Sequence, residues 1–310
     1  MAPVLLTGAL FPSWQDFQPF LVTGLALGGV YALSGVGMVV LYRATGVLYL
    51  AFGAVGAFGA LVAWQMVNQW GWNQWLAYAA GVAVAALLTL AYGMVFGSAL
   101  AARDSLVKAT ATLGLTLGLL GVMDLLWTSS GGESRSINLP TDNHGFTVGQ
   151  INVTTTQVIC LAVGLAITVG TGAFLRYTKL GTAMRAMAND REITATLGVP
   201  IRRVEAAAWL GCGVLAGIAG ILLADLVALD ATTLTFIVIS SVAAALIAQL
   251  RSVPITFLAA LVIGVVDAAI ESSPSQTFSN YHDMTPFVLA AAALLVINRR
   301  RVISISREGI

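Results

Sequence analysis

The side chains that could do chemistry are few in this chain, and its basic residues are unevenly distributed. The sequence has no G-x-x-x-x-G-K-[ST] motif, so it lacks the loop that cradles ATP phosphates. It also has no H-E-x-x-H and no G-x-S-x-G motif, so neither a zinc protease nor a serine hydrolase is indicated. Yet residues 176–204 carry six of the 15 lysines and arginines: Arg176, Lys179, Arg185, Arg191, Arg202 and Arg203. No catalytic residue is therefore predicted, and this polar segment needs another explanation.

Three aspartates, Asp124, Asp225 and Asp267, lie inside or at the end of apolar runs. A carboxylate within a membrane is costly and is by default a functional candidate. Each of the three could receive the ammonium group of a solute, or could be held by structural pairing and solvation. We count them as candidates for a substrate path, although the sequence does not place them near one another.

The cysteines and histidines indicate no further site. Cys160 and Cys212 lie in apolar runs, where small packing residues are expected rather than a disulfide, a metal ligand or a nucleophile. His144 and His282 lie in predicted outer loops without a second ligand beside them. No metal site is therefore predicted.

The elements that must position these residues are membrane helices. Hydrophobic residues make up 58% of the chain and charged residues 9%, with a mean hydropathy of +0.89. A soluble domain carries about 25% charged residues. The apolar runs are continuous, unlike the alternating segments of a β-barrel. The composition predicts an all-α, polytopic transmembrane bundle. The net charge of +1 gives no information about nucleic-acid or acidic partners, and no nucleic-acid partner is expected.

A span needs about 20 apolar residues. Nine candidates occur, and eight to ten is the expected range. They cover residues 20–41, 46–67, 75–100, 106–127, 156–175, 204–227, 234–250, 254–270 and 285–297. Glycines at four-residue spacing, such as Gly24/Gly28, Gly114/Gly118 and Gly213/Gly217, are expected to let these helices pack closely, and some could instead allow sliding.

Basic residues predict the orientation, because cytoplasmic loops carry an excess of lysine and arginine. Nine spans with a cytoplasmic C-terminus put the N-terminus outside and leave only Arg135, of the 15 basic residues, outside. Residues 1–310 then form one transmembrane domain, with an outer loop at 128–155 and a cytoplasmic segment at 176–204.

The cytoplasmic segment is predicted to form two short helices. Residues 182–188 are good helix formers, and Asp190 is a suitable N-cap for a second helix that runs to Leu197. Gly198 fits the position that ends a helix, and Pro200 follows it. The apolar side of the pair consists of Ala183, Met184, Met187, Ile193, Ala195 and Leu197. This side is expected either to lie on the bundle or the lipid, or to dock into a groove of a soluble partner.

The stretch LGTAMRAMANDREITATLGVPIRRV, followed by LAGIAGILLADLVALDATTL, resembles the permease subunits of branched-chain amino acid (Liv-type) ABC importers. The first span, GLALGGVYALSGVGMVVLY, and the order of the later segments extend the resemblance over most of the chain. In that family the first stretch contains the coupling segment that contacts the ATPase. The resemblance therefore implies an ATPase-coupling role for Arg185, Ala186, Ala188, Asn189, Asp190, Arg191, Ala195 and Gly198.

The resemblance also implies a function and partners. The chain would be a permease subunit, not an enzyme, that moves branched-chain amino acids or a related small polar or aromatic metabolite inward. It would lie in the inner or plasma membrane of a prokaryote, with a second, paralogous permease, two ATPase subunits and an external solute-binding protein. The chain itself would hold no cofactor, because ATP and Mg²⁺ would bind to the ATPases. A short rigid helix joined to spans on both sides can transmit a rigid-body push.

Two stretches depart from the family's pattern. Its second conserved helix usually opens with N-F-A-(H/Q)-G, where this chain has Tyr49-Leu50-Ala51-Phe52-Gly53. A G-G-x-G-S-x-P sequence is typical after the seventh span, where residues 248–254 read AQLRSVP. We expect Tyr49 and Phe52, together with Tyr31 of the first conserved helix, to belong to the substrate path. They would favour a larger or more apolar cargo, unless the paired permease supplies most of the polar contacts.

The predicted outer loop contains a hairpin signal. The sequence HGFTVGQINVT alternates apolar residues around Gly149-Gln150, which predicts a small β-hairpin. This hairpin either caps the bundle or forms a docking surface for an external solute-binding protein.

Two other functions remain as alternatives. A secondary transporter or channel would work without ATPases, but such carriers often show inverted repeats, and none is clear here. An intramembrane enzyme is disfavoured because the apolar spans contain no histidine.

Overall fold

The computed structural model describes residues 14–100, 103–127, 135–137, 139, 145–148, 151–227, 229–273 and 284–295. The predictions for His144, His282, the Gly149-Gln150 turn and the arginines near the C-terminus lie outside the described residues. Nearly all of the described residues are helical, so the predicted all-α class is confirmed.

The helices before the hairpin are α1 (Trp14–Thr45), α2 (Phe52–Asn68), α3 (Gln74–Leu100) and α4 (Ser105–Trp127). After it come α5 (Thr155–Tyr177), α6 (Lys179–Asn189), α7 (Arg191–Thr196), α8 (Ile201–Leu226), α9 (Ala231–Ile247), α10 (Val253–Glu271) and a further apolar helix, Thr285–Leu295. Strands β1 (Gly145–Val148) and β2 (Ile151–Thr154) pair antiparallel, with Gly145 opposite Thr154. The predicted hairpin is therefore confirmed.

Among the described residues, six helices are long and apolar enough to cross a membrane: α1, α3, α4, α5, α8 and α10. Three shorter apolar helices, α2, α9 and Thr285–Leu295, account for the remaining predicted spans. The chain is thus a multi-pass helical bundle, whereas the count of nine spans and the orientation of the termini stay predictions.

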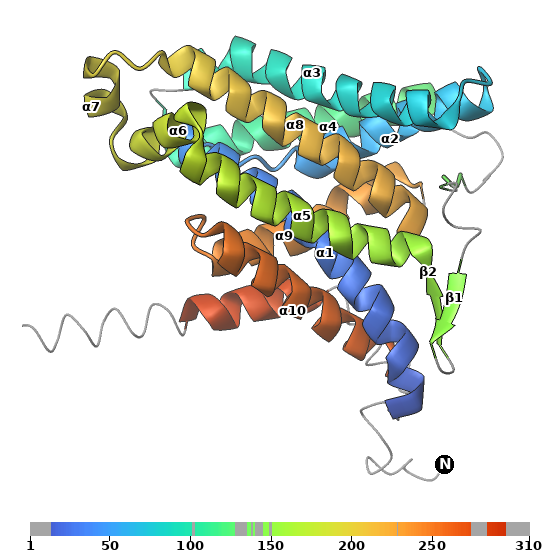
Figure 1. Cartoon of the computed structure of the whole chain (residues 1–310). Helices are drawn as coiled ribbons and strands as arrows, with labels where there is room; N and C mark the ends of the chain where they lie inside the picture. Colours follow the sequence, from blue (N-terminus) through green and yellow to red (C-terminus); the bar gives the residue numbers. More distant parts are fainter. Residues whose placement is uncertain are drawn as a thin grey trace, which may run out of the picture.

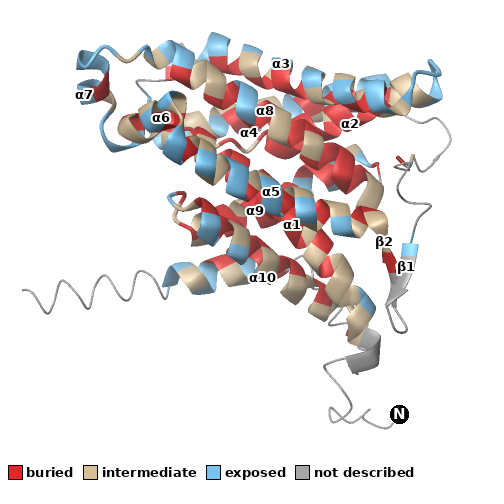
Figure 2. Ribbon diagram, in the orientation of Figure 1, coloured by how far each residue is buried: buried red, intermediate tan, exposed pale blue. Residues whose placement is uncertain are grey.

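The helices form a bundle with two distinct ends (Figure 1). Helices α6 and α7 lie at one end, and the β1–β2 hairpin lies at the opposite end; we call these the α6–α7 end and the hairpin end. Helix α1 lies at the centre, against α5, α8, α9 and α10. Buried residues concentrate on α1, α2 and α8, whereas α3, α4 and α5 keep exposed faces (Figure 2). Those faces are rich in apolar side chains such as Leu117, Leu125 and Val169, which suits contact with lipid.

Glycines let the central helices approach closely, as their spacing predicts. A Cβ built on Gly24 of α1 would lie 2.6 Å from the carbonyl oxygen of Gly264 on α10. A Cβ built on Gly56 of α2 would lie 2.7 Å from the carbonyl oxygen of Ala216 on α8. Backbone contacts this close leave room for no other residue. Gly114 and Gly118 of α4 differ, because a Cβ on either would meet nothing within 4 Å.

The prediction of a continuous span over residues 46–67 was wrong for its first six residues. Gly46 has a φ of +68°, which ends α1, and residues 46–51 form a non-helical connection before α2 begins at Phe52. The Leu50 amide donates to the Thr112 hydroxyl of α4 (3.2 Å), and that hydroxyl lies 3.1 Å from the carbonyl oxygen of Leu48. Such a partner is needed because non-helical backbone is tolerated within a membrane protein only where its polar groups are satisfied.

Candidate functional site

The segment between α5 and α8 folds as two short capped helices, as predicted. Helix α6 begins after Thr178, whose hydroxyl accepts a hydrogen bond from the Gly181 amide (3.0 Å). Helix α7 begins after Asp190, whose Oδ1 accepts one from the Ile193 amide (2.9 Å). Gly198 has a φ of +80°, a conformation that favours glycine, and the chain turns there towards α8. Asp190 as the cap and Gly198 as the stop are therefore confirmed.

The apolar side of this helix pair is divided between two environments. Met184 and Met187 of α6 are 2% and 6% exposed and belong to the core of the bundle. Ile193 and Leu197 are 59% and 77% exposed, and α7 is mostly blue in Figure 2. Helix α6 therefore packs on the bundle, whereas α7 and the residue after it present apolar side chains that the described part of the chain leaves uncovered.

The residues predicted to couple to an ATPase all lie on this helix pair and the turn that follows. Five are exposed, namely Ala188, Asn189, Asp190, Ala195 and Gly198, and three are half-buried, namely Arg185, Ala186 and Arg191. Arg191 Nη2 lies 2.6 Å from Glu205 Oε1, and this ion pair joins the start of α7 to the start of α8. Glu205 was not singled out from the sequence, because its partner is set by how α7 folds back on α8.

The hairpin end holds a cavity of about 670 Å³ between α1, α8, α9 and α10, which we call the α1–α10 cavity. Its acidic lining residues are Asp267 and Glu271, and Tyr31 adds a phenol. Hydroxyls and apolar side chains complete the wall, among them Thr23, Thr232, Thr233, Ser240, Leu27, Phe236 and Phe287. The described residues that line this cavity include no lysine or arginine.

A second cavity at the same end, of about 530 Å³, lies against α2, α4 and the start of α9, and we call it the α4 cavity. Its charged lining residues are Asp124, Arg135 and Asp230. The Arg135 guanidinium lies over the Trp64 ring, 5.1 Å from its centroid. Apolar side chains form the rest of the wall, including Leu61, Leu120 and Met123. The α4 cavity therefore presents charges of both signs beside an apolar surface, and it shares Thr232 with the α1–α10 cavity.

Comparison with known proteins decides the family. The sequence model of the permease component of branched-chain amino acid transport systems matches residues 20–299. The chain belongs to this permease family. Membership makes it a transport subunit rather than an enzyme, and it implies an ABC transporter with ATPase and binding-protein partners.

Individual relatives are similar over about two thirds of the permease. The high-affinity branched-chain amino acid transport system permease protein LivH of Escherichia coli (strain K12) is 28% identical over 221 residues, covering 67% of this chain and 70% of LivH. The corresponding protein BraD of Pseudomonas aeruginosa is 26% identical over 223 residues, covering 68% and 72%. Among solved structures, PsaBC from Streptococcus pneumoniae in complex with Fab has a TM-score of 0.50 and 14% identity over 91% of each chain. At that identity the similarity concerns the fold alone.

The permease brings together only some of the residues predicted for a substrate path. Tyr31 and Asp267 share the α1–α10 cavity, and Asp124 lies in the α4 cavity. Asp225, in contrast, accepts a hydrogen bond at Oδ1 from the Leu139 amide (2.8 Å) and so holds the connection that follows α4. Asp225 therefore has a structural partner, and a substrate contact stays a prediction for all four residues.

Tyr49 and Phe52 lie in the core of the permease. Both are at most 1% exposed, and neither lines the α1–α10 cavity or the α4 cavity. The Tyr49 ring meets the Trp209 ring edge to face, with centroids 5.3 Å apart, while Phe52 packs against Gly37 of α1. These two aromatic rings fill the core, and their predicted contact with substrate stays untested.

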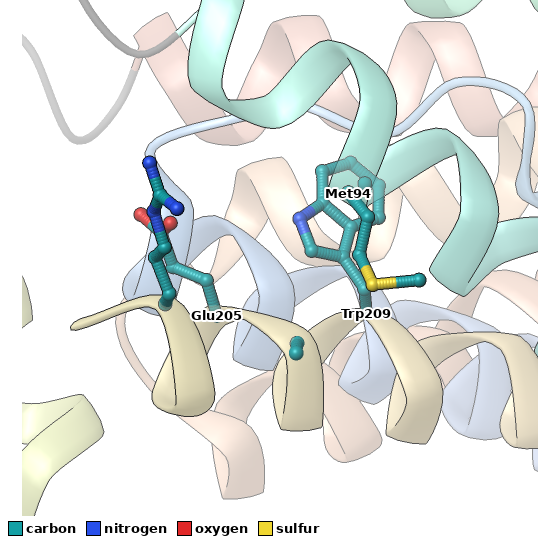
Figure 3. Close-up of a pocket in the computed structure, with 6 residues that line it drawn as sticks. Met94, Glu205 and Trp209 are labelled. Carbon is teal, nitrogen blue, oxygen red and sulfur yellow. The ribbon is translucent and has the colours of Figure 1, made fainter. Parts of the chain in front are cut away.

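Trp209 also lines a smaller pocket, of about 280 Å³, between α3 and α8. Figure 3 shows Met94 of α3 and Glu205 and Trp209 of α8 around it. A Cβ on Gly93 of α3 would overlap the Trp209 indole, so a glycine is required there for the ring to fit.

A cavity at the α6–α7 end was not predicted from the sequence. It has a volume of about 850 Å³, and its basic lining residues are Arg43, Lys108, Arg191 and Arg251; we call it the basic cavity. The Arg43 guanidinium donates to the carbonyl oxygen of Arg251 (3.3 Å), 208 residues away in the sequence. No local pattern links such positions, and the only signal was the excess of basic residues in the predicted cytoplasmic loops.

Proposed function

We propose that this permease moves a branched-chain amino acid, or a related small polar or aromatic metabolite, from the outside into the cytoplasm. Partner ATPases drive the movement through α6 and α7. LivH and BraD are permease proteins of branched-chain amino acid transport systems, which supports this substrate class. The observation that carries the proposal is the uncovered apolar surface of Ile193 and Leu197, on a helix joined to α8 by the Arg191–Glu205 pair. Exposed apolar patches mark interaction sites.

The proposal includes an assembly in the inner or plasma membrane of a prokaryote. Two ATPase subunits bind ATP and Mg²⁺ and grip the α6–α7 end from the cytoplasm. A second, paralogous permease completes the membrane part, and an external solute-binding protein delivers substrate at the hairpin end. The Arg191–Glu205 ion pair between α7 and α8 supports this arrangement, because a push on α7 would then reach a membrane-spanning helix directly.

The α4 cavity suits an amino acid in its charges. Arg135 can form charge-assisted hydrogen bonds with a carboxylate, and Asp124 and Asp230 attract an ammonium group. Leu61, Leu120 and Met123 give an apolar wall for a branched side chain. Because the α1–α10 cavity shares Thr232 and carries Asp267 and Glu271, it offers the ammonium group a neighbouring position.

The test is a mild-detergent purification of the tagged chain from its native membrane, followed by leucine uptake into liposomes. An ATPase with a phosphate-binding motif and a second permease at stoichiometric amounts, with ATP-dependent uptake, would support the proposal. A chain that purifies alone and moves leucine without ATP would contradict it and favour a secondary transporter or channel.

A further inference from the structure

The basic cavity collects positive charge from parts of the chain that are distant in sequence. Arg43 comes from the end of α1, Lys108 from the start of α4, Arg191 from the start of α7, and Arg251 from the turn between α9 and α10. Asn189 and Gln249 add amide groups, and the described residues that line the cavity include no carboxylate. Convergence of four cations on one hollow creates a positive potential that attracts anions.

Glu205 offsets only part of this charge. It forms an ion pair with Arg191 and also acts electrostatically on Lys108, and the described residues that line the cavity include no carboxylate. Arg185 of α6 adds a further positive charge that acts on Arg43. Like charges held together raise each other's energy, and a bound anion relieves that cost.

One wall of the basic cavity is strained. Gln249 and Leu250 have φ values of 53° and 55°, in the left-handed region that favours glycine. The Gln249 amide donates to the Leu246 carbonyl (2.8 Å) and the Leu250 amide to the Ala245 carbonyl (2.8 Å), the pattern that ends a helix with a left-handed residue. Non-glycine residues in this conformation cluster at functional sites. Here the strained turn brings Arg251 to the cavity, within hydrogen-bond distance of Arg43.

The depth of the cavity suggests which anions can reach it. Its residues lie where α1 and α9 end and where α4 and α10 begin, so they stand at the boundary between the apolar spans and water. Lipid phosphates lie at this level, and basic pockets between helices on the cytoplasmic side bind lipid headgroups. Arginine binds phosphate through two parallel hydrogen bonds, and lysine does so as a point charge.

We propose that the basic cavity binds a phosphate group, carried by an anionic phospholipid or by a soluble phosphate. The bound phosphate neutralises Arg43, Lys108 and Arg251, and it ties the start of α4 to the end of α1 and to the α9–α10 turn. This site is separate from the proposed substrate cavities, which lie at the opposite end of the bundle.

The experiment measures the thermal unfolding midpoint of the full-length chain in phosphatidylcholine nanodiscs. One arm adds phosphatidylglycerol to the disc, and the other adds inorganic phosphate to the buffer. We expect at least one addition to raise the midpoint by several degrees, because a ligand that binds only the folded state stabilises it. An increase with phosphatidylglycerol alone identifies the lipid as the source, and an increase with phosphate identifies the soluble anion.

The variant K108Q/R251Q should lose this increase. The matched control, R103Q/K179Q, also removes one arginine and one lysine. Both lie at the α6–α7 end but do not line the basic cavity, so the control should keep the increase in the unfolding midpoint. If the double variant does not fold, K108Q alone should lose part of the increase.

Three outcomes would overturn the proposal. The first is no increase with either addition, and the second is an equal loss in the cavity variant and its control. The third is a cavity variant that responds normally to both additions yet no longer co-purifies with an ATPase, which would assign the basic cavity to acidic residues of that partner.

Discussion

The two ends of the bundle differ in the charge of their cavities and in where they place apolar side chains. At the hairpin end, Asp267 and Glu271 line one cavity, and Asp124 and Asp230 face Arg135 in the other. Apolar side chains there form cavity walls. At the α6–α7 end, the described lining of the basic cavity has no carboxylate, and the apolar side chains of Ile193 and Leu197 are exposed.

This difference separates two kinds of recognition. A cavity with charges of both signs and an apolar wall suits a small solute that carries its own charges, and such sites are mostly apolar with a few placed polar groups. A protruding apolar helix beside a basic surface suits a larger partner. If the two ends are separable in this way, a change at one end should leave recognition at the other end intact.

The largest effect is expected at the uncovered face of α7. Replacing Ile193 and Leu197 together by serine should lower ATP-driven leucine uptake by roughly 30-fold or more, because interface anchors commonly contribute about 2 kcal/mol each. The unfolding midpoint should stay unchanged, since both side chains are exposed. The control is serine at Trp70 and Trp72, which are also exposed but lie at the hairpin end. An equal loss of uptake in the control would remove the distinction between the ends.

The next effect concerns the α4 cavity. Arg135→Gln should raise the leucine concentration for half-maximal uptake about tenfold or more, because a hydrogen bond to a charged group contributes about 1.5–3 kcal/mol. Arg135→Lys, which keeps the charge, should restore part of the affinity. Arg103→Gln, at the other end of α4, serves as the control. An unchanged half-saturation concentration would exclude the α4 cavity from the substrate path.

A smaller effect is expected at the cap of α7. Asp190→Ala removes the acceptor for the Ile193 amide and should cost about 1 kcal/mol, which frays α7 and lowers uptake about fivefold. Asp190→Asn keeps a capping oxygen and should retain most of the activity. Adding Arg191→Ala to Asp190→Ala should lower uptake further, because Glu205 then loses its partner. Full uptake by this double variant, with normal membrane insertion, would contradict the coupling role.

The smallest effects compare one backbone conformation at the two ends. Gln249→Gly should raise the free energy of unfolding by about 1 kcal/mol, because glycine adopts a positive φ without strain. Gly71, at the hairpin end, has a φ of +65° and open space around it, so Gly71→Ala should lower the free energy of unfolding by a similar amount. Thermal unfolding of the purified chain measures both. A lower free energy of unfolding in Gln249→Gly would show that the contacts of the glutamine side chain stabilise the fold by more than its positive φ destabilises it.

The features that could be predicted from the sequence follow from local chemistry. Asp190 caps α7 because its carboxylate reaches an amide three residues ahead, and Gly198 turns the chain because it lacks a Cβ. The β1–β2 hairpin pairs residues that are close in sequence. The charge distribution predicts that residues 176–203 and the hairpin lie at opposite ends of the bundle. In the structure, α6 and α7 lie at one end and the β1–β2 hairpin lies at the other.

The features that could not be predicted depend on contacts between distant residues. Hydropathy predicts that the second span begins at Gly46, because residues 46–51 are apolar. It contains no information about the Thr112 hydroxyl of α4, which forms hydrogen bonds with the backbone of Leu48 and Leu50 and so permits a non-helical connection. It does not show that Tyr49 packs on Trp209 in the core, nor that Arg43 meets Arg251. The cavities arise from such contacts, so the sequence could name Tyr31, Asp124 and Asp267 without grouping them.

Helix α8 has a mechanical consequence for the whole molecule. It has 26 residues, so it is about 39 Å long, and a tilt of about 5° around a point roughly 25 Å from its start would move that start by about 2 Å. Near its start, Glu205 forms an ion pair with Arg191 of α7, and its second half lies backbone against backbone on α2 at Gly56. It ends at Leu226, which lines the α1–α10 cavity. If α8 tilts as a rigid rod, the glycine contact is the point about which its two ends move in opposite directions, and a larger residue at Gly56 would push α2 and α8 apart.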